Sequence, residues 1–378
     1  MSDYDQQALN KHRQLKGKLS ISLKDDLDSK QKLSIYYTPG VAAVSDYVAK
    51  HPEQVGDYTW TNNLVAVISD GSAVLGLGNI GPEAALPVME GKAMLFKHFA
   101  DIDAVPIVLN VHSADEIVTA VEAIAPSFGG INLEDIAAPI CFEVEDRLKA
   151  SLKIPVMHDD QHGTAIVVLA GLINATRLTN RQLKSTKVVL VGAGAAGVAI
   201  AKLLNLYAPG VNIVAVDSQG IISHQRQDLN DSKLALLGFT NHHDDHGSLR
   251  DAIQTADIFI GVSQPGLLSA DMVKTMAKDP IIFAMANPNP EILPDVAKAA
   301  GAAIVATGRS DFPNQVNNAL AFPGIFRGAL DNNVTAITDE HKIKTAEVIA
   351  GLADTSIGQI VPPIGDQRLV KAIAKVII

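Results

Sequence analysis

The chain contains 378 residues, which at roughly 150 residues per domain predicts two or three domains. Hydrophobic residues make up 47% and charged residues 19%, a balance that supports a large core and excludes a disordered chain. The net charge is −10 and Lys and Arg form no run, so nucleic acid is not expected as a partner.

Apolar and amphipathic segments alternate in the first half of the chain. Residues 1–30 are polar and periodic and predict one or two helices, before a loop at residues 37–41. Strands are expected at residues 65–70, 104–110, 130–133 and 155–158. Helices are expected between them at residues 90–99, 114–125 and 143–152. Alternation of this kind predicts a wound α/β sheet.

The alternation restarts after an apolar helix expected at residues 164–178. Strands are expected at residues 187–191, 211–217, 258–262, 281–285 and 303–307, with a helix after the first of them at 197–206. After Pro323 the chain is predicted to be mostly helical. We therefore predict an α/β domain at residues 1–158, a second α/β domain at 159–317, and a helical C-terminal segment at 318–378 that packs on the first domain.

The pattern G-x-G-x-x-G occurs twice. The copy with the context of a dinucleotide site is formed by Gly192, Ala193, Gly194, Ala195, Ala196 and Gly197. It directly follows a strand and opens a helix whose N–H groups can face a pyrophosphate, and the next strand ends in Asp217, an acid placed to accept hydrogen bonds from a ribose. The copy at residues 76–81 is followed by Pro82 and lacks a correctly placed acid. The second domain is thus predicted to be a Rossmann-type NAD domain, and the first to bind the substrate.

The residues after Asp217 bear on the form of the cofactor. A 2′-phosphate would be repelled by Asp217 and would need a nearby cation, which Gln219 does not supply. Arg226 lies several residues further on and would have to fold back to reach it. We therefore expect NAD rather than NADP.

Two pairs of acids mark a possible metal site. Glu134 and Asp135 form one pair, and Asp159 and Asp160 form another where a short strand ends. Carboxylates that converge at strand ends suit a hard cation such as Mg²⁺ or Mn²⁺. The spacing alone leaves an alternative open, because Asp160 can equally cap the helix expected to begin near Thr164.

Three other features are ambiguous on sequence grounds. The segment 241–246 holds three histidines that could bind zinc, but its polarity favours a solvated loop. Lys92 lies in a mostly apolar helix, where a lysine either extends its amine to solvent or enters a pocket with a lowered pKa and acts as a base. Tyr37 precedes a Thr-Pro-Gly turn and can be structural or functional.

The sequence also bears on the cellular compartment. The longest apolar stretch, around residues 164–175, is shorter than the ~20 residues that a membrane span needs. The first residues are acidic and polar, unlike a signal peptide, and the single cysteine, Cys141, excludes an intrachain disulfide. We expect a cytoplasmic protein with no membrane partner.

Several long motifs, in order, resemble the malic enzymes, specifically their short bacterial form. They are YTPGVA at 37–42, DGSAVLGLGNIG at 70–81, PVMEGKAMLFK at 87–97, EDIAAPICFEVE at 134–145, HDDQHGTA at 158–165, VGAGAAG at 191–197, ANPNPE at 286–291 and the segment 306–331. The resemblance covers nearly the whole chain. It implies oxidative decarboxylation of malate to pyruvate with NAD or NADP and a divalent metal, and it suggests a homodimer.

The resemblance also implies roles for individual residues. Tyr37 matches the general acid of the family, Lys92 the general base, and Asp159 the acid that assists the lysine. The metal ligands match Glu134, Asp135 and Asp160. The asparagines that contact the substrate match Asn287 and Asn318, with Asn287 also beside the cofactor. In this mechanism Lys92 takes the hydroxyl proton of malate and Tyr37 protonates the enolate, and burial and the metal are expected to lower the pKa of Lys92.

One position departs from the family. Long-form relatives place an arginine that holds the substrate carboxylate where this chain has Ala73, which leaves Arg309 and the amides of residues 76–81 as candidates. The sequence does not decide whether Tyr37 and Lys92 serve one active site within a chain or are exchanged across a dimer.

Two other functions compete with this reading. A malolactic-type enzyme, which makes lactate with bound NAD, shares the motifs, although chains of that type resemble the longer family form. A non-catalytic NAD sensor would be expected to lose the acid, the base or the metal carboxylates, and all of them are present.

Overall fold

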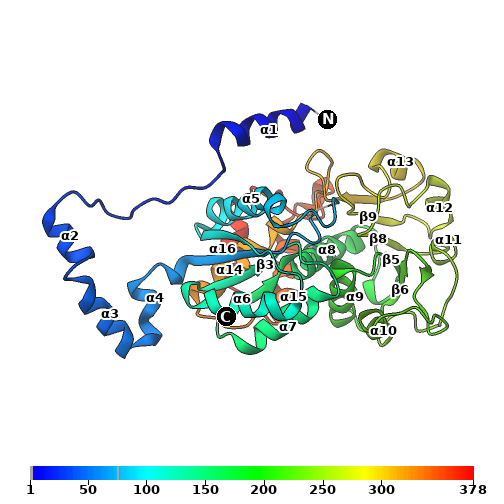
Figure 1. The fold of residues 1–378 in the computed structure, drawn as a ribbon. Coiled ribbons are helices and arrows are strands. Elements are labelled where there is room, and N and C mark those ends of the chain that lie inside the picture. The colour runs from blue at the N-terminus through cyan, green and yellow to red at the C-terminus, as the bar shows by residue number, and fades with distance from the viewer. Residues whose placement is uncertain (1–2, 75) are drawn as a thin grey trace.

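The computed structural model describes residues 3–74 and 76–378, so Leu75 of the first glycine motif lies outside it. Two sheets lie side by side and are joined by the long helix α8 (Asp159–Leu178), as Figure 1 shows. The first sheet is parallel, and so is the second apart from one short edge strand. This α/β architecture, with a Rossmann-type second unit and a helical C-terminal end, confirms the predicted fold class.

The first sheet has the order β2-β1-β3-β4. Its strands are β1 (Leu64–Ser69), β2 (Asp103–Val108), β3 (Gly130–Leu133) and β4 (Val156–His158). The helices between them are α5 (Pro82–Ala100), α6 (Ala114–Ile124) and α7 (Ile140–Ser151). Strand β2 pairs with one edge of β1, and β3 pairs with its other edge. The direction of winding therefore reverses between β1 and β3. Ligand crevices form at the carboxyl ends of strands at such reversals.

The second sheet has the order β10-β9-β8-β5-β6-β7. Its strands are β5 (Lys187–Val191), β6 (Asn212–Asp217), β7 (Gly220–Ile221), β8 (Ile258–Gly261), β9 (Ile281–Ala284) and β10 (Ile304–Thr307). The accompanying helices are α9 (Ala195–Tyr207), α10 (Asp231–Leu237), α11 (Leu249–Ala252), α12 (Ala270–Thr275) and α13 (Pro294–Ala299). Only β7, which was not predicted, pairs antiparallel. Here the winding reverses between β5 and β8.

The C-terminal part of the chain packs back onto the rest of the body. It contains α14 (Phe322–Asp331), α15 (Asp339–Leu352) and α16 (Arg368–Ala374). Phe322 and Phe326 of α14 pack edge to face on Phe96 of α5, with ring centroids 4.7 and 5.3 Å apart. Helix α15 packs along α8. Short 3₁₀ turns are η1 (Pro52–Gln54), η2 (Thr61–Asn63), η3 (Ala125–Ser127), η4 (Leu183–Ser185), η5 (Asn318–Leu320) and η6 (Thr355–Ile357).

The N-terminal arm stands off the body. It contains α1 (Asp3–Leu15), α2 (Lys30–Tyr36), α3 (Val41–Lys50) and α4 (Val55–Tyr58). Helices α2 and α3 contact each other and lie well away from both sheets (Figure 1). Large apolar side chains of the arm are exposed, among them Ile21, Leu23, Leu27, Leu33, Ile35, Tyr36, Tyr37, Val44 and Tyr47.

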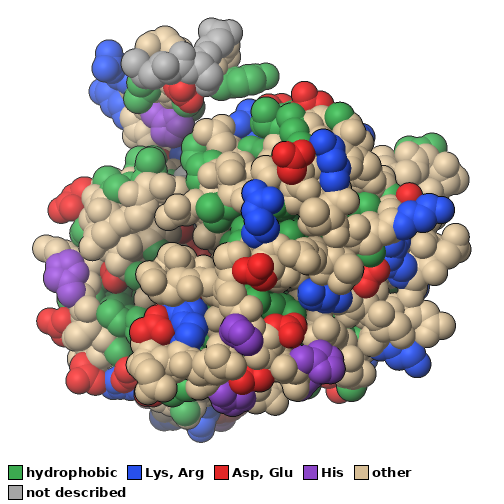
Figure 2. Space-filling view, turned by 90° about the vertical axis from the view of Figure 1, so that its right-hand side faces the viewer, with side chains coloured by type: hydrophobic (Ala, Val, Ile, Leu, Met, Phe, Trp, Pro, Cys, Tyr) green, Lys and Arg blue, Asp and Glu red, His purple; other side chains and the backbone are tan. Residues whose placement is uncertain are grey.

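The surface seen from the side of the second sheet is mixed in charge. Figure 2 shows α1 projecting above the body and basic and acidic side chains interspersed on this face, without a basic patch. Within residues 3–74 and 76–378, no helix has both the length and the apolar character that a bilayer crossing requires.

Candidate active site

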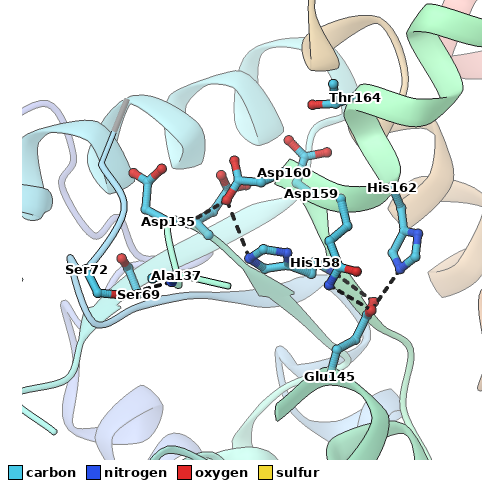
Figure 3. A network of polar contacts seen from close by, with 12 residues as sticks. Ser69, Ser72, Asp135, Ala137, Glu145, His158, Asp159, Asp160, His162 and Thr164 are labelled. Carbon is cyan, nitrogen blue, oxygen red and sulfur yellow. Dashed lines mark hydrogen bonds and ion pairs between the residues drawn. The ribbon is translucent and has the colours of Figure 1, made fainter. Parts of the chain in front are cut away.

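The two predicted acid pairs meet at the carboxyl ends of adjacent strands. Glu134 and Asp135 follow β3, and Asp159 and Asp160 follow its neighbour β4. The backbone N–H of Asp135 donates to Asp160 Oδ2 at 2.7 Å (Figure 3). Helix α8 begins at Asp159 rather than near Thr164, so both acids lie in its first turn, where the helix dipole favours negative charge. The residue that precedes the helix is His158, so the interpretation of Asp160 as its N-cap is wrong.

Lys92 joins this cluster from α5. Its Nζ lies 2.6 Å from Asp159 Oδ2 and 2.8 Å from Glu134 Oε1, and its side chain is 12% exposed. The ring of Phe322 lies against the ammonium, with its centroid 4.4 Å from Nζ. Lys92 therefore does not extend its amine to solvent but bridges one carboxylate from each pair.

The electrostatics of Lys92 reverse one expectation. Burial alone would lower its pKa, but the charges of Asp159 and Glu134 outweigh burial, and the pKa of Lys92 lies above its ordinary value. Burial raises the pKa of Glu134, and although Lys92 opposes this, the charges of Asp159, Asp160 and Asp135 add to it. The predicted lowering of the Lys92 pKa is thus wrong for this arrangement, in which the lysine is a charged partner of the carboxylates.

Asp159 is held through its Oδ2 by two side chains. It is fully buried, and besides Lys92 it accepts a hydrogen bond from Asn318 Nδ2 at 3.0 Å. Asn318 Oδ1 in turn accepts from Thr164 Oγ1 at 3.1 Å. A Cβ on Gly163 would lie 1.9 Å from Asp159 Oδ1, so glycine is required there. The structure thus brings Lys92, Asp159 and Asn318 into one hydrogen-bonded group.

The acids of this edge suit a divalent cation by their chemistry. Glu134, Asp135 and Asp160 offer carboxylate oxygens, the ligands that Mg²⁺ and Mn²⁺ prefer. Burial is the main cause of the raised pKa of Glu134, and such a cation would relieve the repulsion from the other acids that adds to it. Among residues 3–74 and 76–378, no three acidic, His or Cys side chains already form a metal-binding group, and Glu134 contacts Lys92. The residues therefore fit a metal as donors, and Lys92 is the cation that contacts Glu134 in this structure.

The second glycine motif has the predicted strand-loop-helix form. Strand β5 ends at Val191 and α9 begins at Ala195, with Gly194 as its N-cap. Gly192 has φ +109°, and a Cβ on Gly197 would lie 1.8 Å from Gly192 O, so both positions demand glycine. Ala195 packs against the core of the first unit, and α9 packs along α8. The loop is therefore linked through α8 to the acid cluster.

Asp217 lies at the end of β6 as predicted, but it is already covered. Its Oδ1 accepts from the N–H of Gln219 at 2.8 Å and from Arg226 Nη1 at 2.7 Å. Its Oδ2 accepts from Arg226 Nη2 at 3.0 Å and from Lys233 Nζ at 2.7 Å. Burial opposes ionisation, but these hydrogen bonds lower the pKa of Asp217 to about 2. Arg226 has thus folded back, and Lys233, which lies 16 residues after the acid and was not predicted, also contacts it.

The first glycine motif contacts the loop that carries Asn287. A Cβ on Gly76 would lie 2.1 Å from Asn287 O, so the two loops touch. Arg309 Nη1 donates to Pro288 O at 3.0 Å, beside Asn287. Ala73 donates its N–H to Asp135 O at 2.9 Å, which ties the same loop to the acid cluster. Asn287, Arg309 and the loop at 76–81 thus lie together, and the motif serves a contact between the two units.

Two other candidates lie away from this site. Tyr37 follows α2 on the arm and is 67% exposed, so the structure does not bring it to Lys92. His242, His243 and His246 are exposed in the loop between α10 and α11, as expected of a solvated segment.

Comparison with known proteins gives matches over nearly the whole chain. Residues 16–116 and 112–149 match the family model "Malic enzyme, N-terminal domain", and residues 161–377 match "Malic enzyme, NAD binding domain". A bifunctional malic/malolactic enzyme of Bacillus subtilis is 55% identical, over 98% of this chain and 92% of that protein. An NADP-dependent malic enzyme of Rhizobium meliloti is 51% identical, over 93% of this chain and 46% of that protein.

Solved structures agree with these matches. The crystal structure of an NAD-dependent malic enzyme from Thermotoga maritima superposes with a TM-score of 0.95 at 48% identity, covering 98% of both chains.

Proposed function

The chain belongs to the malic enzyme family, and from that premise we propose that it oxidises and decarboxylates L-malate to pyruvate and CO₂ with reduction of NAD. The observation that carries the proposal is Lys92, held by Asp159 and Glu134 beside the contact between Asp135 and Asp160. Oxidation of a secondary alcohol on a metal needs a base for the hydroxyl proton and carboxylates to bind the metal, and both kinds of group lie here.

In the proposed mechanism Lys92 Nζ takes the C2 hydroxyl proton of malate, and Asp159 holds the resulting ammonium. Glu134, Asp135 and Asp160 would hold Mn²⁺ or Mg²⁺, which supplies Lewis acidity toward the substrate oxygens, and a bound nicotinamide supplies the hydride acceptor. Lys92 must be neutral to act as a base. Engagement of Glu134 by a cation would remove one of the two carboxylate charges that raise the pKa of Lys92, while Asp159 would stay beside it. Asn318 fixes Asp159, and Asn287 is placed for the substrate and cofactor.

We place the general acid, Tyr37, in the site of a second copy of the chain. The arm that carries Tyr37 stands off its own body and exposes many apolar side chains, and Tyr37 itself is 67% exposed. Covering that surface with a second copy would bury apolar area and deliver a phenol to the partner's Lys92. We therefore propose a homodimer in which each site combines residues of both chains.

The preference for NAD rests on the position of Asp217 at the end of β6. All four acceptor positions of its carboxylate are filled, two of them by Arg226 and one by Lys233, so a ribose diol must displace one of these donors. The same cations would favour a 2′-phosphate, and the Rhizobium relative is NADP-dependent. NAD and NADP must therefore be compared directly.

A malolactic reaction is the second candidate. The Bacillus relative carries both activities in its name and this chain covers 92% of its length, so chain length does not separate the two reactions as expected. The product does separate them, since malolactic turnover yields lactate without free NADH.

A malate assay with Mn²⁺, run separately with NAD and NADP, tests the proposal. We expect reduced nicotinamide and pyruvate, lost on chelation of the metal. Lactate without free NADH would assign the malolactic reaction. Turnover that survives chelation would contradict the metal site, and the absence of any product with Mn²⁺ and either cofactor would contradict the proposed activity.

A further inference from the structure

One buried carboxylate outside the acid cluster is surrounded by nitrogen atoms that can donate hydrogen bonds to it. Glu145 lies on α7 and its side chain is 4% exposed. Its Oε1 accepts from the backbone N–H of His158 at 3.0 Å and lies 2.7 Å from Lys149 Nζ. Its Oε2 accepts from Gln161 Nε2 at 3.3 Å and contacts His162 Nε2 at 2.8 Å. Each oxygen therefore has two partners, which fills the acceptor capacity of a carboxylate.

These partners have a specific position in the chain. His158 precedes Asp159 and Asp160, and Gln161 and His162 follow them, so Glu145 holds the chain on both sides of the acid pair (Figure 3). Only Lys149, one turn along α7, lies outside this segment. Glu145 thus fastens the turn that presents the acids, although it touches neither of them.

The other acid pair is connected to the same helix. Helix α7 begins at Ile140, shortly after Glu134 and Asp135 at the end of β3. Glu145 on α7 binds the residues at the start of α8. It therefore fixes the two acid pairs, one before α7 and one at the start of α8, relative to each other. Burial opposes the charge of Glu145, but its hydrogen bond with His162 and its ion pair with Lys149 hold its pKa below the ordinary value. Burial lowers the pKa of His162 to about 4, so His162 acts as a hydrogen-bond partner and Lys149 supplies the positive charge. The grip is thus charge-assisted, which makes these hydrogen bonds stronger than those between neutral groups.

We propose that Glu145 is a positioning residue for the metal site: it orients the first turn of α8 so that Asp160 lies against Asp135 and Asp159 against Lys92. The inference rests on the proposed function, since it assumes that Asp160 is a metal ligand. Residues that orient metal ligands without touching the metal typically change metal affinity or activity 10- to 100-fold when replaced.

Glu145→Gln tests the proposal because it keeps the shape of the side chain. The amide nitrogen cannot accept hydrogen bonds, so the grip on one side of the acid pair is lost. We expect the affinity for Mn²⁺, measured by electron paramagnetic resonance of the free ion, to fall about tenfold. The affinity for NAD, measured by calorimetry on the same protein, should stay within twofold.

Lys149→Gln is the matched control. It breaks the ion pair with Glu145 but leaves the carboxylate and the donors of α8 in place, so Mn²⁺ affinity should fall less than in Glu145→Gln. A second test, His162→Phe, removes one donor of the turn and keeps the carboxylate. It should weaken Mn²⁺ binding by less than the tenfold loss expected for Glu145→Gln, because the other donors of the turn remain. This variant keeps the test available if Glu145→Gln does not fold.

The outcomes are distinct. Weaker Mn²⁺ binding with unchanged NAD binding supports the positioning role. Unchanged Mn²⁺ affinity in a folded Glu145→Gln protein, or an equal loss of Mn²⁺ and NAD affinity, overturns it. Absence of Mn²⁺ binding by the unaltered protein would instead contradict the metal site of the proposed function.

Discussion

Lys92 and Tyr37 lie in equally clear sequence motifs but in opposite surroundings. Lys92 is 12% exposed and bridges two carboxylates at the junction of two strand ends. Tyr37 is 67% exposed on an arm whose helices contact each other rather than the sheets. A motif therefore predicts which chemistry a residue performs, but it does not predict whether one chain completes the site. Variants of both residues test this difference between a base held within its own chain and a general acid supplied by a second copy.

The largest effect is expected for Lys92→Met. Loss of the base should reduce kcat about 10³- to 10⁴-fold, at the upper end of general-base effects. Removing the ammonium also leaves Asp159 and Glu134 without their cation, which should cost on the order of 3 kcal/mol of unfolding free energy without metal. Mn²⁺ should restore part of this stability, so thermal unfolding with and without Mn²⁺ accompanies the kinetics. A kcat within tenfold of the original would remove Lys92 from the role of base.

Tyr37→Phe should reduce kcat about 10²-fold, because it removes a proton donor and little else. Because the replacement removes only a hydroxyl that lies outside the body of its own chain, it should change the unfolding free energy far less than the replacement of Lys92 does. Steady-state kinetics and urea unfolding measure the two effects. A loss of stability comparable to that of Lys92→Met would show that the tyrosine is integrated in the body.

Gly163→Ala tests how tightly the body holds Asp159. The new Cβ would lie 1.9 Å from Asp159 Oδ1 in a buried site, which should cost about 1–3 kcal/mol and displace the acid from Lys92. Activity should fall with it, by at least tenfold. The matched control is Gly351→Ala in α15, where no atom lies within 4 Å of a Cβ and alanine should be neutral or stabilising. Equal behaviour of the two variants would mean that the packing around Asp159 is loose.

The smallest expected effect is the loss of stability on replacement of Asp217, and it depends on pH. Its pKa is about 2 in the folded protein, below the ordinary value of about 3.9 in an unfolded chain, so its ion pairs stabilise the fold above that value. Asp217→Asn should cost about 1–2 kcal/mol at pH 7, and the difference should shrink as pH falls from about 4 toward 2. Urea unfolding at several pH values measures this. Asp25→Asn, which breaks exposed contacts of the arm with Lys32 and Tyr36, should have no measurable effect.

Much of the body follows from local sequence patterns. The buried strands are short β-branched runs, and the glycine loop with Asp217 is placed as its spacing predicts, because these features depend on neighbours in the chain. The acid pairs are visible in the sequence, but their contact depends on β3 and β4 being adjacent. The apolar run placed the start of α8 near Thr164, whereas the polar residues from Asp159 onward also belong to the helix.

What could not be predicted depends on contacts between distant segments. The pKa of Lys92 rises because two carboxylates from other elements surround it, which a helical pattern does not reveal. Glu145 was missed for the same reason, although its spacing of four residues from Lys149 offered a hint. The N-terminal arm contains ordinary helical patterns. Its sequence does not predict whether the arm packs on its own chain or on a second copy.

Mixing two inactive variants tests the central claim, that one site combines Tyr37 and Lys92 from different chains. Tyr37→Phe and Lys92→Met proteins are mixed in equal amounts, dissociated and reassembled. If the residues come from different chains, half of the dimers are mixed and each has one intact site, so about a quarter of the original activity returns. If both residues of a site come from one chain, every site keeps one defect and the mixture stays as inactive as its parts, which would contradict the account.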